Sequence, residues 1–355
     1  IDSVVIGGGE ITVIEILDRI VKTKNLHGIK GAAFRENGKT VANPPRPLME
    51  NLDMLPFPAR ELLGAEEKYI PPPATYRRKP VAVIMTSRGC GGKCIFCFQM
   101  DRKRKSGVRY RSVENVLDEV ELCLKRGYRE IKFIDDSLGS GHGRVLRLAA
   151  EIKRRRLDFT WFASVCANQV DKPMLQAMKD AGCWAVLIGG ESGVQKNLDA
   201  IRKGVTLKRI RDAVGAAKEV GLRVSVPFIF GIPGETFEDA LQTIDFAIEM
   251  DPDLANFHAI TPFPGTPLHD NAEKYGVLSS DLCDYTYQGA AFVPHTMTRD
   301  QILEARRLAF RRFYSRPSFL VRRLAAIRSW NDCRTAAAGL RSLFWIWLEN
   351  TNLHK

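Results

Sequence analysis

Between residues 81 and 260, short apolar runs alternate with longer segments in which apolar residues recur every three or four positions. The runs predict buried strands and the longer segments predict amphipathic helices. Six strands are expected, at Val81–Met85, Ile131–Ile134, Phe159–Val165, Ala185–Ile188, Arg223–Phe230 and Ala255–Ile260. Helices are expected between them, at Val113–Lys125, Arg144–Arg155, Lys172–Ala181, Leu207–Val220 and Phe237–Glu249. Strands joined by helical connections pair in parallel, in a barrel or a doubly wound sheet, and both folds place ligands at the carboxyl ends of the strands.

The first 42 residues have a different pattern. Asp2–Ile6 predicts a strand, and a turn at Gly7-Gly8-Gly9-Glu10 separates it from a helix over Ile11–Lys24. Ala32–Phe34 and Thr40–Val41 flank an Asn-Gly pair, which is a strong signal for a β-hairpin. The chain is therefore expected to begin with one βα unit and a hairpin.

The segments that flank the regular region differ in composition. Nine prolines lie between Pro44 and Pro80, and this density excludes a long helix or a central strand, so an extended linker is expected. The tail after Thr298 has helical periodicity. Phe319, Leu320, Leu324 and Ile327 lie opposite Arg322 and Arg323 in that tail, with Trp330, Phe344, Trp345 and Trp347 beyond.

Composition changes this picture little. Apolar residues make up 45% of the 355 residues and charged residues 26%, which excludes disordered, collagenous and coiled-coil classes. No apolar run is long enough to cross a bilayer, since the densest late stretch, Leu343–Leu348, has six residues. The net charge is +12, and twelve basic residues stand against four acidic ones from Arg299 to Lys355. The excess is therefore concentrated in the tail, with a second basic cluster at Arg102–Arg111.

Three of the eight cysteines, Cys90, Cys94 and Cys97, fall within eight residues directly after the first strand of the regular region. Because the other five cysteines are scattered, a disulfide framework is not expected. A metal site whose cysteines stay reduced in the cytosol is expected instead. Structural zinc usually takes four ligands in two pairs, and an electron-carrier cluster usually takes four cysteines. Three cysteines on a four-iron cluster leave one iron open to a ligand, so an open-site iron–sulfur cluster is the favoured interpretation.

A Cys-x-x-x-Cys-x-x-Cys loop after the first strand of a βα array, with Phe96 before the third cysteine, resembles the radical S-adenosylmethionine (SAM) superfamily. The resemblance covers about residues 81 to 270 and implies a partial (β/α)6 TIM-like barrel of the α/β class. It implies a 4Fe-4S cluster on Cys90, Cys94 and Cys97, with SAM bound at its open iron. An electron from the cluster then cleaves SAM to a 5′-deoxyadenosyl radical.

The resemblance also implies SAM contacts at the ends of later strands, namely Phe96, Asp135, Asp136, Ser137, Asn168, Glu191, Pro227 and Ile229. From the residues alone, each has a plainer interpretation. Asp135–Ser137 could be a helix cap, and Gly189–Gly193 could be a plain turn. The strand that holds Pro227 and Ile229 could be a buried core strand and nothing more. Cys166 stands where relatives often carry an arginine, so a cationic contact at that strand is in doubt. The motifs assign no residue a catalytic role.

A narrower resemblance concerns the N-terminal flank. Gly7, Gly8, Gly9 and Glu10 resemble the last βα turn of a Rossmann-like cobalamin-binding domain, and Leu55-Pro56-Phe57-Pro58-Ala59-Arg60 resembles the linker of cobalamin-dependent radical enzymes. A generic dinucleotide turn is the alternative for the glycines. The resemblance implies an N-terminally truncated protein in four parts. Residues 1–30 are the remnant of the cobalamin domain, 31–80 the hairpin and linker, 81–295 the barrel, and 296–355 a basic helical region.

The expected function is reductive cleavage of SAM for cobalamin-dependent methylation or ring formation on a hydrophobic, porphyrin- or hopanoid-like small molecule. The alternatives are a tRNA methylthiotransferase and a non-catalytic iron–sulfur protein that binds nucleic acid. The first normally has a second cysteine triplet, yet residues 1–89 contain no cysteine. The expected partners are the substrate and a flavodoxin- or ferredoxin-type electron donor, rather than nucleic acid. The expected location is the cytoplasm, with the tail as a candidate for peripheral membrane contact through its arginines and aromatic residues.

Overall fold

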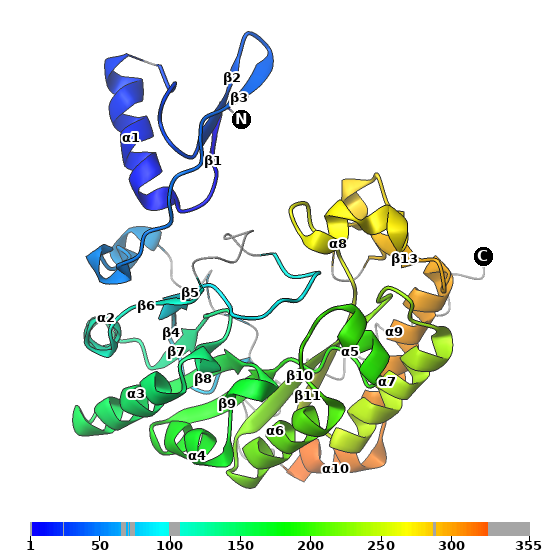
Figure 1. Ribbon diagram of the computed structural model, residues 1–355. Helices are drawn as coiled ribbons and strands as arrows, with labels where there is room; N and C mark the ends of the chain where they lie inside the picture. The colour runs from blue at the N-terminus through cyan, green and yellow to red at the C-terminus, as the bar shows by residue number, and fades with distance from the viewer. Residues whose placement is uncertain are drawn as a thin grey trace.

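The computed structural model describes residues 2–23, 25–64, 69, 71, 75–98, 107–286 and 289–325. Its centre is a parallel sheet of six strands in the order β11-β10-β9-β8-β7-β4 (Figure 1). The strands are β4 (Val81–Ile84), β7 (Glu130–Phe133), β8 (Thr160–Val165), β9 (Cys183–Ile188), β10 (Arg223–Phe230) and β11 (Leu254–Ala259). Strand order follows chain order, as in a barrel that has not closed, and the predicted partial (β/α)6 barrel is confirmed.

Helices cover the outer face of this sheet. They are α2 (Val113–Lys125), α3 (His142–Arg154), α4 (Lys172–Asp180), α6 (Leu207–Glu219), α7 (Phe237–Met250) and α9 (Arg299–Tyr314). Alternate strand residues bury against them; on β8 these are Trp161, Ala163 and Val165. Side-chain oxygens cap the first turn of five of these helices, at Ser112, Asp171, Thr206, Thr236 and Thr298. All the predicted strands and helices of this region are present within two residues of their predicted ends, whereas the short helix α5 (Gln195–Ala200) was not predicted.

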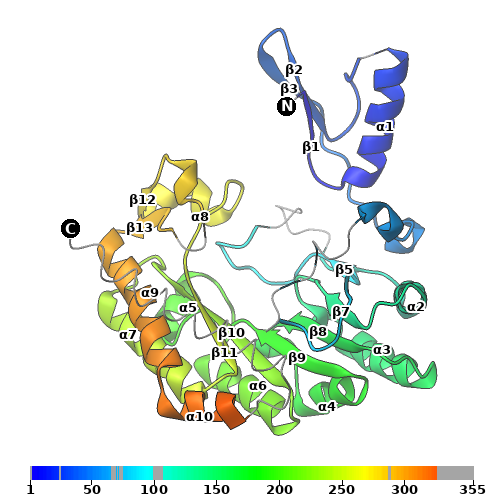
Figure 2. The ribbon, with the colours of Figure 1, turned by 180° about the vertical axis from the view of Figure 1, so that it is seen from behind.

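The N-terminal unit consists of β1 (Ser3–Val5), α1 (Gly9–Lys22) and the hairpin β2 (Ala32–Glu36) and β3 (Lys39–Ala42). The three strands form an antiparallel sheet in the order β1-β2-β3. Asn37 and Gly38 both have positive φ, 50° and 75°, which gives the tight turn that the Asn-Gly pair predicts. In Figures 1 and 2 this unit lies on the side of the barrel that bears the carboxyl ends of the strands.

A small lobe and the linker are two other segments outside the barrel. A small lobe contains α8 (Pro267–Asp270), β12 (Gly276–Leu278) and β13 (Phe292–Pro294) and faces the N-terminal unit in both views (Figures 1 and 2). The described part of the linker contains 3-10 turns at Leu52–Met54 and Arg60–Leu63, and its described residues include no α-helix and no paired strand. The division into four domains stays a prediction.

The tail is described as far as α10 (Pro317–Ala325). Phe319 is buried against Phe313 and Tyr314, and Arg322 pairs with Asp251 at the end of α7. Within residues 2–325 as described, no helix is long and apolar enough to cross a membrane. The remaining tail residues behind the membrane-contact prediction (Ile327, Trp330, Phe344, Trp345 and Trp347) lie outside the described residues, as do the side chains of Arg323 and Leu324 and the basic residues Arg102–Lys105.

Candidate active site

The cysteine loop leaves the sheet through a narrow neck. After β4, the two-residue strands β5 (Ser87–Arg88) and β6 (Arg109–Tyr110) pair antiparallel. Gly89 follows with φ of 99°, and a Cβ there would lie 2.5 Å from the carbonyl oxygen of Gly107. Only glycine fits this position, because both its backbone conformation and its neighbour exclude a side chain. The neck therefore fixes where the loop begins, one residue before Cys90.

The first two thiols face a common space within the loop. The backbone N–H of Gly92 donates to Cys90 Sγ at 3.3 Å, and a Cβ on Gly92 would lie 3.3 Å from Cys90 Sγ and 3.9 Å from Cys94 Sγ. Partial burial raises the pKa of Cys94, and the Lys203 ammonium group opposes that shift. Cys97 is exposed, and Cys90, Cys94 and Cys97 form no disulfide.

Ile95 anchors the middle of the loop to the barrel. Its N–H donates to the Ile201 carbonyl at 3.1 Å, and its own carbonyl accepts from the N–H of Leu268 at 2.9 Å. Its side chain, 7% exposed, belongs to an apolar cluster that also contains Ile229, with Phe96 packed at its margin. The structure thus brings together Phe96 and Ile229, two of the predicted SAM contacts, and holds both beside the cysteines.

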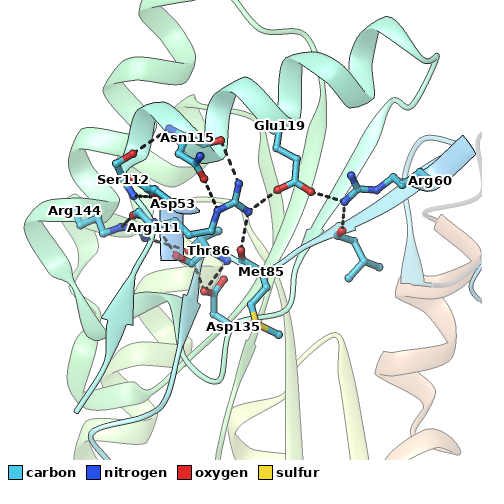
Figure 3. Close-up of polar contacts among 11 residues, drawn as sticks. Asp53, Arg60, Met85, Thr86, Arg111, Ser112, Asn115, Glu119, Asp135 and Arg144 are labelled. Atoms are coloured by element: carbon cyan, nitrogen blue, oxygen red, sulfur yellow. Dashed lines mark hydrogen bonds and ion pairs between the residues drawn. The ribbon is translucent and has the colours of Figure 1, made fainter. Parts of the chain in front are cut away.

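The acidic segment after β7 divides into buried and exposed residues. Asp135 is 4% exposed, and its Oδ1 accepts from the N–H and hydroxyl of Thr86 and from the hydroxyl of Ser87 (Figure 3 shows the contacts with Thr86). Ser137 is also buried and accepts from the N–H of Cys166 at 3.1 Å. Asp136 is exposed and accepts from the N–H of Gly89 at 3.1 Å. Of the three predicted contacts, Asp136 therefore faces the loop, while Asp135 and Ser137 hold strand ends in place.

A buried ion pair lies close to Cys94. Lys203 Nζ is 2.6 Å from Glu191 Oε1, and the two side chains are 12% and 9% exposed. A Cβ on Gly189 would lie 2.6 Å from each of these atoms, so this glycine leaves the space that the pair occupies. Burial tends to lower the pKa of Lys203, but the charge of Glu191 outweighs it and raises that pKa, which keeps the lysine protonated. The Glu191 N–H also donates to the Pro227 carbonyl at 2.9 Å, which joins two predicted contacts.

A cavity of about 360 Å³ separates the loop from the N-terminal unit. One wall is the glycine turn at Gly7–Gly9, and the opposite wall includes Cys90 and Asp136. Glu10 and Arg88 form an ion pair within the same lining, and this contact with Arg88 lowers the pKa of Glu10. Further lining residues are mainly apolar, namely Leu48, Met85, Phe98 and Ile134, together with Arg109. The structure therefore places all four predicted cobalamin residues at the cavity that the first cluster cysteine also lines.

Comparison with known proteins identifies the family. A model of the radical SAM superfamily matches residues 84–247. The uncharacterized methyltransferase PH0819 of Pyrococcus horikoshii is 37% identical over 328 residues, which cover 91% of this chain and 69% of that protein. The chain belongs to the radical SAM superfamily.

Two further proteins extend the comparison. The anaerobic magnesium-protoporphyrin IX monomethyl ester cyclase of Rubrivivax gelatinosus is 29% identical, over 90% of this chain and 58% of that enzyme. The structure of the methyltransferase TsrM from Kitasatospora setae, with cobalamin and a [4Fe-4S] cluster bound, superposes with a TM-score of 0.65 at 20% identity. The superposition covers 86% of this chain and 62% of TsrM, and it shows that the two proteins share the fold. The predicted radical SAM enzyme class is thus confirmed, in a chain that spans about three fifths to two thirds of these relatives.

Enzymes of the radical SAM superfamily use a 4Fe-4S cluster and SAM, and the loop fits the cluster. Among the described residues, no group of three or more His, Cys, Asp or Glu side chains is close enough to hold a single metal ion. A four-iron cluster is larger and takes each thiolate on a different iron, so its ligands lie farther apart than those of one ion. A Cβ on Gly92 would contact both Cys90 Sγ and Cys94 Sγ, so the two sulfurs lie beside the same point of the loop and glycine leaves the room around them. Cys90, Cys94 and Cys97 would hold the cluster there.

Two residues near the loop make contacts that the sequence did not indicate. Asn168 is exposed, and its side-chain amide donates to the Gly204 carbonyl. Lys203 supplies a cation beside Cys94 and Cys166, where the absence of an arginine at position 166 had left a cationic contact in doubt. Sequence reasoning missed Lys203 because it lies in a polar turn after α5, with no periodicity or motif to single it out. The SAM roles of the individual residues stay predictions.

Proposed function

We propose that the chain is the catalytic core of a cobalamin-dependent radical SAM enzyme that methylates, or forms a ring on, a hydrophobic small molecule. The observation that carries this proposal is the cavity lined by both Gly7–Gly9 and Cys90. A cofactor that rests on the glycine turn would lie against the cluster loop, without a protein layer between them. Glycine suits that wall because it lets a large ring system approach the backbone closely.

The cysteine cluster, when bound, supplies the electron that splits SAM into methionine and a 5′-deoxyadenosyl radical. The residues of this chain would orient SAM for that step. Asp136 presents an exposed carboxylate at the loop for the SAM ammonium group, and Lys203 is the cation available for its carboxylate. Phe96 and Ile229 offer an apolar surface to the adenine, and Glu191 and Pro227 form the adjoining wall.

The lining of the cavity supports the substrate class. Leu48, Met85, Phe98 and Ile134 contribute apolar surface, while Arg109 and Asp136 contribute charge at the same cavity. A pocket that is mostly apolar with a few polar groups suits a hydrophobic molecule carrying one or two polar substituents. The names of the relatives are consistent with this class, since they include a porphyrin ester cyclase and methyltransferases.

The remaining partners of the proposed enzyme follow from its chemistry and charge. Reduction of the cluster requires an external electron donor, of the flavodoxin or ferredoxin type. Nucleic acid is not proposed as a partner, because several basic side chains at the C-terminal end pair with acidic residues of the barrel. Arg312 pairs with Asp245, and Arg316 and Arg322 both pair with Asp251. A cytoplasmic location, with peripheral membrane contact by the tail, stays part of the proposal.

The test is retention of cobalamin on the anaerobically reconstituted protein, measured by absorbance after gel filtration. Gly8→Leu introduces a side chain at the cavity wall without backbone strain, since Gly8 has φ of −66°. Gly143→Leu is the matched control, because nothing lies within 4 Å of a Cβ at that exposed position. We expect the wild-type and control proteins to retain cobalamin and Gly8→Leu to lose it, with SAM cleavage preserved in all three. Equal retention by Gly8→Leu, or none by the wild type, would refute the cobalamin assignment.

A further inference from the structure

The strand that leads into the cysteine loop lies at an open edge of the sheet. β4 pairs only with β7 among the described strands. The Ile84 carbonyl accepts from the N–H of Ile134 beyond the end of β7, so the alternating carbonyls of Val83 and Met85 point away from β7. An unpaired edge of this kind leaves backbone groups to be satisfied by something other than a strand.

Two arginines bind these carbonyls, and one carboxylate holds both arginines (Figure 3). Arg60 Nη2 donates to the Val83 oxygen at 2.7 Å, and Arg111 Nη1 donates to the Met85 oxygen at 3.0 Å. Glu119 of α2 accepts from Arg60 Nη2 at 2.6 Å through one oxygen and pairs with Arg111 through the other. Its side chain is 2% exposed and that of Arg60 is 7% exposed. Charges this deeply buried persist only as a complete set, because an unpaired one would be strongly destabilising.

The same network continues to the start of the cysteine loop. The Arg111 carbonyl accepts from Arg144 Nε at 3.2 Å, and Arg144 donates to the hydroxyl and the carbonyl oxygen of Thr86, both at 3.1 Å. The N–H of Thr86 in turn donates to Asp135 at 3.0 Å. Figure 3 shows these contacts as one connected set that includes Thr86, four residues before Cys90, and Asp135.

The network begins in the proline-rich linker. Asp53 accepts from the N–H of Ser112 at 2.9 Å, at the N-terminus of α2. The Arg111 guanidinium lies 5.5 Å from the ring centre of Phe57, in a cation–π arrangement. With Arg60, these contacts give a physical role to the linker motif that the sequence singled out without explaining.

We infer that Glu119 is a positioning residue for the cysteine loop, which locks the linker arginine Arg60 and Arg111 onto the free edge of β4. The inference rests on the proposed function, because what it positions is the loop that carries the cluster. Without Glu119, β4 keeps its pairing with β7 but loses the lateral restraint on Val83 and Met85. The end of β4, from which the cysteine loop begins, then becomes more mobile. The linker thereby becomes part of the scaffold of the active site.

The opposite edge of the sheet provides a natural comparison. Tyr314 Oη donates to the Ala255 carbonyl at 2.7 Å, and Arg306 Nε donates to the Phe257 carbonyl at 3.3 Å, so α9 covers the free edge of β11. That edge is separated from β4 by the whole width of the sheet. A change there perturbs the edge of the sheet without perturbing the cysteine loop.

The experiment compares Glu119→Gln with two controls in the full chain. Glu114→Gln makes the same chemical change on the same helix, at an exposed pair with Arg147, and Tyr314→Phe weakens the distant edge. Hydrogen exchange by mass spectrometry follows residues 81–90 without the cluster. Electron paramagnetic resonance of the reduced cluster, with and without SAM, and the rate of 5′-deoxyadenosine formation follow the loop itself.

For Glu119→Gln we expect at least tenfold faster exchange in residues 81–90, a changed cluster spectrum with SAM, and at least tenfold slower SAM cleavage. Both controls should match the wild type. If Glu119→Gln matches its controls in spectrum and rate, the inference is overturned, even where exchange changes. If it does not fold, a variant that combines Arg60→Met, Arg111→Met and Glu119→Met replaces the whole charged set by apolar groups. A wild-type spectrum and rate in that variant overturns the inference, and an altered spectrum in the folded variant supports it. Failure of the wild type itself to cleave SAM counts against the proposed function, while the exchange data still test the restraint on β4.

Discussion

Replacing Ile95 by alanine should release the cysteine loop while leaving the barrel folded. Ile95 is 7% exposed and belongs to an apolar cluster whose other members include Ile201, Ile229 and Leu268. The substitution removes three buried carbon atoms, which at about 1 kcal/mol each costs about 3 kcal/mol. The loop attaches to that cluster by the buried Ile95 side chain, by Phe96 at the margin and by two backbone hydrogen bonds. The loss therefore falls on local opening of the loop rather than on global unfolding. The population of the open loop should therefore rise about a hundredfold.

Hydrogen exchange of the peptide that spans residues 90–98 measures this opening directly, and the iron content after reconstitution measures its consequence. Ile14→Ala is the matched control, because Ile14 is 68% exposed on α1. We expect exchange about a hundred times faster and reduced iron retention for Ile95→Ala alone, with a melting temperature within a few degrees of the wild type. Unchanged exchange in this peptide, or cooperative loss of the whole barrel, would show that Ile95 does not act as a local anchor.

Three more predictions follow from the same structure. Lys203→Met keeps the aliphatic stem but removes the charge that pairs with Glu191, so the apparent KM for SAM should rise at least tenfold with the cluster spectrum retained. The exposed control Lys208→Met should leave the KM unchanged. An unchanged KM in Lys203→Met would exclude Lys203 as a SAM contact. Gly193→Ala would bring a Cβ within 2.5 Å of Phe246 Cβ and 2.8 Å of Thr243 Cα, so denaturant unfolding should show a free energy of unfolding lower by about 1–3 kcal/mol. Gly143→Ala, whose Cβ would have no atom within 4 Å, should lower it far less. Equal effects of the two substitutions would contradict the packing argument. Burial raises the pKa of Glu235 from 4.5 to about 8, although two backbone N–H groups donate to it. The folded state therefore holds a proton that the unfolded state releases, and the free energy of unfolding should fall as pH rises from about 4.5 to about 8. Urea titrations at several pH values should show that this pH dependence is reduced in Glu235→Gln. An identical pH dependence in the two proteins would mean that Glu235 is ionised in the folded protein.

The barrel could be predicted from the sequence because its signals are local. Short apolar runs predict the strands, and amphipathic periodicity predicts helices such as Val113–Lys125, whose first turn is capped by the side chain of Ser112. Gly89 and Gly92 are likewise visible in the sequence, although their function in shaping the neck and the sulfur space appears only with the structure. The cysteine spacing could point to the loop because all three predicted cluster ligands lie within one short segment.

The features that escaped prediction depend on long-range contacts. Glu119 appears in the sequence as one more acidic residue on an amphipathic helix, and its burial results from Arg60, 59 residues away, and from Arg111. Asp135 was predicted as a SAM contact, yet the structure directs one of its oxygens to Thr86 and Ser87, a partnership that no spacing reveals. Lys203 is a third case, since only the fold brings it next to Glu191 and Cys94. Side chains whose partners lie on other strands carry little signal in periodicity or motif.

The measurement that tests the account most directly is reductive cleavage of SAM by the chain itself. The protein is reconstituted anaerobically with iron and sulfide, then given dithionite and SAM, and 5′-deoxyadenosine is quantified by chromatography. Cys94→Ala removes a cluster ligand, and Cys283→Ala, at an exposed cysteine outside the loop, is the matched control. The account predicts 5′-deoxyadenosine from the wild type and from Cys283→Ala, and none from Cys94→Ala. Absence of the product from a wild-type protein whose cluster is spectroscopically intact, or equal product from Cys94→Ala, would contradict it.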